Sequence, residues 1–154
     1  MNRIILILMV ALGITACNRE MVYHHYEHVP NNGWEKNDTL SFAISPMAEA
    51  GTYHEDIELR INETYPFLGL TLRVEQTVYP RKESRHQTLS CSLIGKSGQP
   101  KGRGISYYQY SFPLGDLQLE AGDSVQIRIT HNMKREIMPG VTDVGICLRR
   151  YAGK

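Results

Sequence analysis

Long hydrophobic runs are scarce in this sequence of 154 residues. The longest covers residues 4–12, and it is too short for a membrane-crossing helix, which needs about 20 apolar residues. Helical periodicity is also missing, because no stretch keeps apolar residues at helical spacing over ten residues. Neither sign of charge is in excess, since 17 Lys and Arg oppose 16 Asp and Glu. This balance gives no reason to expect binding to nucleic acid or to an anionic membrane surface.

The one apolar run is part of a secretory signal. Residues 1–17 read MNRIILILMVALGITAC, with a basic residue at Arg3, the apolar run, and small residues before Cys17. The last four residues, ITAC, resemble the bacterial lipobox, in which an aliphatic and two small residues precede the cysteine at the cleavage point. The resemblance implies that residues 1–16 are removed and that Cys17 carries acyl chains such as palmitate. Several chains, at about 0.8 kcal/mol per buried methylene, anchor a protein stably where one chain binds marginally.

The membrane that holds this anchor is indicated by the next residue. Residue 18 is Asn, whereas an Asp at this position holds lipoproteins at the inner membrane of enteric bacteria. We therefore expect an outer-membrane lipoprotein that faces the periplasm. The sequence leaves its oligomeric state open.

The rest of the chain is dominated by alternation of apolar and polar residues, with turn-forming residues between the runs. The runs cover residues 40–44, 53–61, 70–78, 89–93, 105–112, 125–129 and 144–148. The run at residues 105–112 is rich in aromatic residues, and the other runs place their alternating apolar residues on one face, with Glu55 as a polar exception on that face. We therefore expect an all-β fold, a single antiparallel β-sandwich of the jelly-roll or immunoglobulin-like type, over residues 34–154. Residues 17–33 are polar and end in turn signals, so we expect a tether there.

Cysteine is also scarce, and the two thiols of the expected domain are not predicted to pair. Cys91 shares a strand face with its apolar neighbours, whereas Cys147 is out of phase with the apolar residues of its own run. The two side chains should therefore point in different directions.

Residues 131–146 interrupt the strand pattern with the sequence HNMKREIMPGVTDVGI. Met133 and Ile137 are four residues apart, so one helical turn from Asn132 would press both onto the sandwich. Pro139 disfavours helix just before it, and Gly140 permits a turn with positive φ. The segment is best interpreted as a packed crossover between the last two strands, with no role in catalysis.

Two short motifs resemble ligand-binding sites, but each lacks a part that such a site needs. The cluster YHHYEH contains His24, His25 and His28, but these lie in the expected tether without a cysteine partner, whereas a closed zinc site needs four ligands on a rigid frame. Residues 95–97 read GKS, like the end of a phosphate-binding loop. No helix follows whose N-terminal amides would hold a phosphate. We predict neither a metal site nor a cofactor site.

Three acidic residues, Glu55, Asp56 and Glu58, lie close together in one run. Alternation places Asp56 and Glu58 on one face and Glu55 on the other, so the pair is best explained as the solvated side of an amphipathic strand. No spacing of Ser, His and Asp matches a nucleophile elbow. We therefore predict no catalytic residue and no enzymatic activity.

The aromatic residues allow two interpretations. They would either fill the sandwich or form a surface for a sugar or a protein partner, because aromatic rings supply much of the energy at both kinds of site. Alternation in ISYYQYSF places Tyr107 on the face opposite its neighbours, so one ring at least should lie outside. The candidates for such a surface are Trp34, Tyr65, Phe67 and Tyr107.

Several motifs, in the same order along the chain, resemble the GldH family of gliding-motility lipoproteins of the Bacteroidetes. They are NNGWEKNDTLSF, LRINETYPFLGLTLRV, TLSCSLIGKSGQPKGRG and, near the C-terminus, MKREIMPGVTDVGI. Together with the lipobox they cover nearly the whole chain. Gly69 replaces the usual Asn and Pro100 stands where the loop usually has Trp, which puts a polar contact near Tyr65 in doubt.

The resemblance implies an outer-membrane lipoprotein that works by protein contact with other gliding and type IX secretion components. Glycan binding and envelope hydrolysis are the alternatives. Three or more coplanar exposed aromatic rings in a groove would favour glycan binding. A polar pocket that holds His54 or His131 against a carboxylate would favour hydrolysis.

Overall fold

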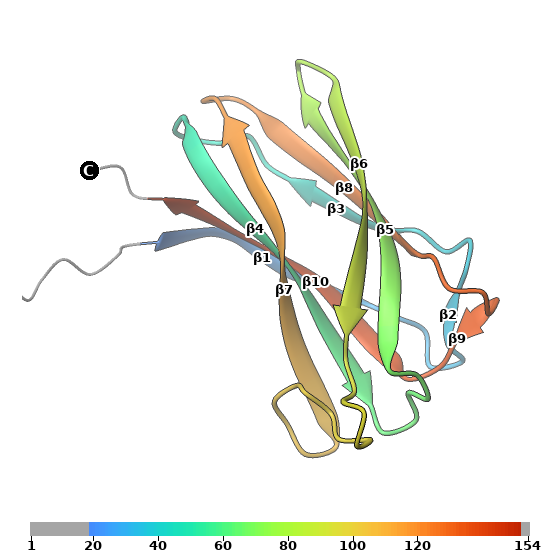
Figure 1. Ribbon diagram of the computed structural model, residues 1–154. Helices are drawn as coiled ribbons and strands as arrows, with labels where there is room; N and C mark the ends of the chain where they lie inside the picture. The colour runs from blue at the N-terminus through green and yellow to red at the C-terminus, as the bar shows by residue number, and fades with distance from the viewer. Residues whose placement is uncertain (1–18, 152–154) are drawn as a thin grey trace, which may run out of the picture.

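The structure is a computed structural model that describes residues 19–151, which contain ten strands and no helix (Figure 1). No helix in this part of the chain has the length and apolar character that a membrane crossing requires. Residues 1–16 and Cys17 lie outside the described residues. The strands are β1 (Arg19–His28), β2 (Trp34–Glu35), β3 (Leu40–Ile44), β4 (Gly51–Asn62), β5 (Gly69–Tyr79), β6 (Glu83–Ser92), β7 (Tyr107–Leu119), β8 (Ser124–His131), β9 (Ile137–Met138) and β10 (Val141–Tyr151).

Eight of these strands form two four-stranded antiparallel sheets. The first sheet has the order β1-β10-β4-β7, and the second has the order β3-β8-β5-β6. This is the strand order of a jelly roll, so the all-β sandwich expected from the alternation is confirmed. The two short strands β2 and β9 pair with each other at one end of the molecule (Figure 1).

The core lies between the two sheets and follows the alternation of the sequence. In β4, every second side chain from Tyr53 to Ile61 points inward, and Ile57 lies between Ile146 of β10 and Phe112 of β7. Trp34, the only tryptophan, is fully buried and donates from Nε1 to the carbonyl of Asp38 at 2.9 Å.

The tether expected over residues 17–33 is wrong for residues 19–28, which form β1. This strand pairs with β10 from Arg19 opposite Tyr151 to His28 opposite Asp143. Its inward side chains are Tyr, His and Glu, so the strand shows no apolar alternation. The His25 ring nevertheless packs edge-on against the Phe42 ring, with 6.3 Å between the ring centroids, and Tyr23 packs against the core. The sandwich therefore includes the segment that precedes residue 34.

The helical turn expected from Asn132 is also wrong. The Asn132 amide donates to the carbonyl of Thr71, and β9 pairs with β2, so these long-range bonds take the backbone groups that a helix would use. Met133 packs against the core, but Ile137 is 43% exposed. The turn at Gly140 is confirmed, since its φ is +81° and a Cβ there would lie 2.4 Å from the Tyr65 nitrogen.

Both cysteines of the sandwich are free and buried. Cys147 points away from the core face of β10, as its phase predicts, yet it is not exposed. Side chains of β1 and β4 cover this outer face of the first sheet, and His24 and Asp56 lie beside Cys147 in the register. Burial raises the pKa of both thiols.

Candidate functional site

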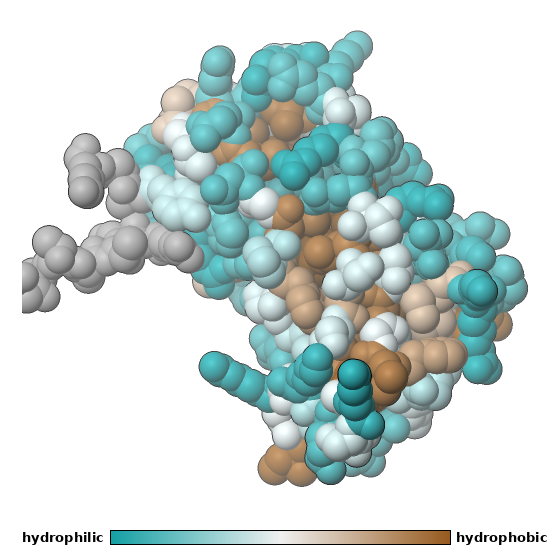
Figure 2. Space-filling model, in the orientation of Figure 1, coloured by the Kyte–Doolittle hydropathy of each residue, from teal (hydrophilic) through white to brown (hydrophobic). Residues whose placement is uncertain are grey.

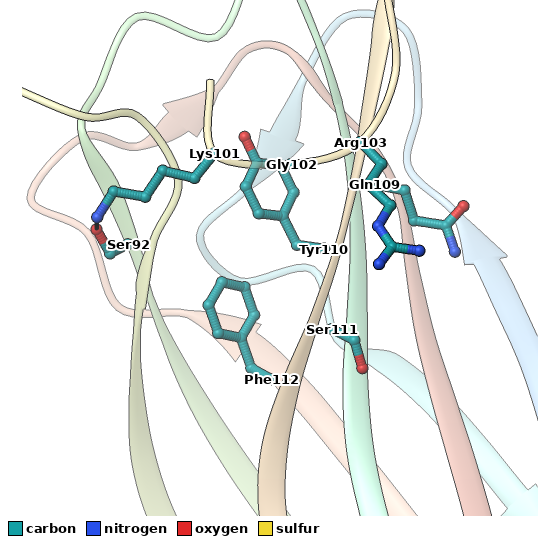
Figure 3. A pocket seen from close by; sticks show the side chains of 8 residues that line it. All are labelled: Ser92, Lys101, Gly102, Arg103, Gln109, Tyr110, Ser111 and Phe112. Carbon is teal, nitrogen blue, oxygen red and sulfur yellow. Dashed lines mark hydrogen bonds between the residues drawn. The ribbon is translucent and has the colours of Figure 1, made fainter. Parts of the chain in front are cut away.

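A cleft lies at the open side of the sandwich, between the edge strands β6 and β7 (Figure 3). Its volume is about 730 Å³. Figure 2 shows a hydrophobic band along this side of the molecule, flanked by hydrophilic side chains. The residues that line the cleft are Ser92, Lys101, Gly102, Arg103, Gln109, Tyr110, Ser111 and Phe112.

The floor of the cleft is a pair of aromatic rings. Tyr110 and Phe112 are two residues apart on β7, so both rings point to the same face, and their planes are 6° apart with centroids 6.0 Å apart. The Tyr110 hydroxyl donates to the carbonyl of Leu93 at 2.7 Å. Gly102 lies directly against the Tyr110 ring, because a Cβ at this position would lie 2.7 Å from it. Tyr110 is thereby held in place, while Phe112 is only partly covered.

The rim of the cleft carries two cations, Lys101 and Arg103, on opposite sides of the aromatic pair (Figure 3). The Lys101 ammonium donates to the Ser92 hydroxyl at 2.6 Å. Arg103 exchanges two backbone hydrogen bonds with Gln109, at 2.9 and 3.1 Å. Within residues 19–151 neither cation has a carboxylate within ion-pair distance, so the rim keeps its positive charge.

The aromatic residues proposed as a surface are distributed differently from the expectation. Trp34 and Tyr65 are buried in the core, so of the two interpretations they fill the sandwich and do not belong to a surface. Phe67 is partly buried and meets the Tyr65 ring edge-on. Tyr107 is 62% exposed, as its phase predicts, and it lies just before the cleft residues of β7. The residues that form the cleft were not predicted, because nothing in the sequence of the loop after β6 shows that it folds back onto β7 and brings Lys101 beside that strand.

The acidic group on β4 is more enclosed than expected. Asp56 and Glu58 share the outer face of the first sheet, as predicted, but both are nearly buried rather than solvated. His24 contacts Glu58 at 2.8 Å, and Tyr26 donates a short hydrogen bond to the same carboxylate oxygen. Burial alone would raise the pKa of Glu58, but the hydrogen bonds from Tyr26 and His24, together with the charges of His24 and Arg149, outweigh it and the pKa is lowered. This cluster fastens β1 to β4 across β10.

Glu55 points into the core, and it is fully buried. Gln76 of β5 donates a short hydrogen bond to one carboxyl oxygen, while the other oxygen and the Gln76 carbonyl have no partner within residues 19–151. Burial raises the pKa of Glu55 to about 7. The carboxyl group is therefore partly neutral at neutral pH.

The two histidines named for hydrolysis have no free ring nitrogen. His54 contacts Asp116 through Nδ1 at 2.6 Å and Asp56 through Nε2 at 3.4 Å. His131 donates to the Trp34 carbonyl from Nε2 and accepts the Met133 amide at Nδ1. Burial lowers the pKa of His131. His54 therefore lies against a carboxylate, but neither histidine is among the residues that line the cleft.

The remaining histidines do not gather around one point. His25 contacts Glu27 at 3.0 Å, and His28 contacts Asp143 at 3.2 Å. Residues 19–151 contain no group of three or more His, Cys, Asp or Glu side chains that could hold a metal ion.

Comparison with known proteins gives one family. A family model described as GldH lipoprotein matches residues 21–148. The chain is also 24% identical, over 147 residues, to the gliding motility lipoprotein GldH of Flavobacterium johnsoniae, and this match covers 91% of each chain.

Solved structures give only distant similarity. A family 35 carbohydrate binding module from Clostridium thermocellum has a TM-score of 0.42 and 15% identity, over 85% of this chain and 98% of the module. A 4-O-methyl-alpha-glucuronidase of family GH115 has a TM-score of 0.40 and 16% identity, over 88% of this chain and 18% of the enzyme. These scores are too low to support an inference about a ligand.

Proposed function

Because this chain belongs to the GldH lipoprotein family, we propose that it is a lipid-anchored protein of the gliding-motility machinery that works by contact with other envelope proteins. The family match over residues 21–148 is the observation that carries this proposal, since it includes every strand except the first two residues of β1 and the last three of β10. Members of the family are lipoproteins of the cell envelope, and the family is not a known enzyme family. We propose further that it associates with components of type IX secretion.

The anchor is the second part of the proposal. Cys17 would carry the acyl chains, in the outer membrane and on its periplasmic side. Only one residue, Asn18, separates Cys17 from the start of β1 at Arg19. Met21 and Val22 near this end of β1 are 53% and 41% exposed, and apolar side chains so close to an anchor would contact the lipid interface.

The position of the cleft agrees with a role in binding partners. Nine residue-to-residue steps along β1 lead from Arg19 to His28, which lies in the same cross-strand row as Gln109 of the cleft. At 3.4 Å per residue this distance is about 30 Å. An anchor at Cys17 would hold the first end of the sandwich at the membrane and present the cleft well above the lipid surface.

Protein contact is favoured over the two alternatives by the side chains at hand. The cleft offers two stacked rings, one of them buried, rather than three coplanar exposed rings for a sugar. His54 lies against two carboxylates, but neither His54 nor His131 is among the residues that line the cleft, so neither is placed to act on a molecule bound there.

Labelling with radioactive palmitate tests the anchor. Wild-type protein in cells should incorporate the label and fractionate with the outer membrane, whereas Cys17→Ser should do neither. Cys91→Ala is the matched control, because this buried thiol should not affect labelling. Label in Cys17→Ser, or a wild-type protein in the soluble fraction, would contradict the anchor. Digestion of intact cells with protease then tests the facing, since a periplasmic domain should survive.

A further inference from the structure

The free edge of β7 exposes backbone groups at the cleft. Gln109 exchanges its backbone hydrogen bonds with Arg103, so in the alternation of an antiparallel ladder its groups point away from β4. Ser111 is two residues further along the strand, so its N–H and C=O point outward in the same way. Neither group has a backbone partner in the described part of the chain. One donor and one acceptor are therefore available at the edge.

The available part of the edge is short. On one side, the segment around Arg103 already covers β7 at Gln109. On the other side, Pro113 occupies the next outward position, where it lacks an N–H but still presents a carbonyl. Beyond it, Gln87 of β6 donates to the carbonyl of Leu114 at 3.2 Å and closes the space between the two edge strands. An added strand would fit over a few residues only.

The chain around the cleft has an unusual charge composition. Between Glu83 and Asp116 there is no acidic residue, while four residues in this interval are basic: Arg85, Lys96, Lys101 and Arg103. Two of these four line the cleft. A ligand that brings negative charge would therefore meet uncompensated cations on both sides of the edge.

We propose that this cleft binds an extended acidic peptide segment of a partner protein, which adds to β7 at Ser111. The segment would exchange hydrogen bonds with the Ser111 backbone, as in other cases of strand addition. Its alternate side chains would point to opposite sides of the edge. An acidic residue on one side would meet Arg103, and an apolar neighbour on the other side would cover Phe112, close to Lys101. This inference rests on the proposed function and specifies the chemistry of the partner.

A peptide explains the site better than an acidic sugar does. A sugar acid would use the cations and the rings, but it has no regular array of N–H and C=O groups to match the Ser111 edge. The proposal therefore depends on the backbone as well as on the charge.

The experiment is selection from a random library of eight-residue peptides on the purified full-length protein in detergent. We expect selected peptides to be rich in Asp and Glu next to aromatic or branched residues. A fluorescent copy of the best peptide should then bind wild type with an affinity that falls as salt rises. Binding should weaken about tenfold or more in Lys101→Gln/Arg103→Gln, and it should also weaken in Ser111→Pro, which removes the edge N–H.

Lys96→Gln is the matched control, because it removes the same charge from the same loop outside the cleft. It should change the affinity less than twofold. The proposal is overturned if the selected peptides are not acidic, or if the best peptide binds the double variant as well as wild type. Tetragalacturonic acid serves as the sugar probe, and its binding at the same site in place of peptides would also overturn the proposal. If the protein binds no acidic peptide but still incorporates palmitate and still contacts motility proteins, the proposed function stands. Only the proposal of an acidic peptide is then rejected.

Discussion

Replacing Glu55 by Gln should change how the stability of the protein depends on pH. Glu55 is fully buried between the sheets and has one hydrogen-bond donor, Gln76. Gln at position 55 has nearly the same shape as a protonated Glu, so it can stay next to Gln76 without carrying a charge. The substitution therefore isolates the cost of ionising the buried carboxyl group.

The magnitude follows from the pKa of Glu55, which burial raises from 4.5 to about 7 in the folded protein. A pKa above its unfolded value means that the folded state holds the proton more tightly. The contribution of Glu55 to the free energy of unfolding is then highest below pH 4.5 and falls as the pH rises from 4.5 through 7. At about 1.4 kcal/mol per pH unit, the total loss is about 3 kcal/mol.

Urea unfolding between pH 4 and pH 8, followed by the fluorescence of the single buried Trp34, measures this effect. The difference in unfolding free energy between wild type and Glu55→Gln should move by about 3 kcal/mol over this range, in favour of the variant at high pH. Glu58→Gln is the control with the opposite sign, because the pKa of Glu58 is lowered and its contribution is lost as the pH falls. A difference for Glu55→Gln that does not change with pH would refute the reasoning.

Two further substitutions test the packing, and a third serves as a control. Gly140→Val should lower the unfolding free energy by about 2 kcal/mol or more. The φ of residue 140 is +81°, and the new Cβ would collide with the Tyr65 backbone. An unchanged midpoint of urea unfolding would contradict this close approach. Arg149→Met should cost about 1–2 kcal/mol, because it leaves the nearly buried Asp56 without the donor that now lies 2.6 Å away. Arg128→Met is the control, because it removes an exposed ion pair in which Arg128 and Glu75 lie 3.8 Å apart. It should lower the unfolding free energy by less than about 0.5 kcal/mol. Equal losses of unfolding free energy in the two Arg variants would contradict the argument that the ion pair of Asp56 matters because it is buried.

The sequence predicts those strands whose apolar side chains alternate and face the core. This holds for β4, where even the exception, Glu55, lies on the inner face as its phase requires. It fails for β1, because the partners of His24 and Tyr26 are polar groups on a strand more than 30 residues away. It also fails for residues 132–138, where the spacing of Met133 and Ile137 suits a helix but pairing with β2 determines the backbone.

The cleft could not be predicted, because it depends on two contacts between distant parts of the chain. The jelly-roll order brings the edges of β6 and β7 to the same side of the sandwich. The loop that follows β6 then returns to β7 and places Gly102 on the Tyr110 ring. The sequence does carry one signal of the cleft, since the absence of acidic residues between Glu83 and Asp116 indicates a basic surface.

Site-specific photo-crosslinking in cells tests the central claim most directly. A photoreactive residue at Ser111, at the edge of the cleft, should give a discrete crosslinked product with an envelope protein of the motility machinery, through an acidic segment identified by mass spectrometry. The product should be lost in Lys101→Gln/Arg103→Gln and absent when the photoreactive residue replaces Ser41, which is exposed on β3 at the opposite edge of the second sheet. The same products from both positions, or none from Ser111 in cells that glide, would contradict a protein that acts through this cleft.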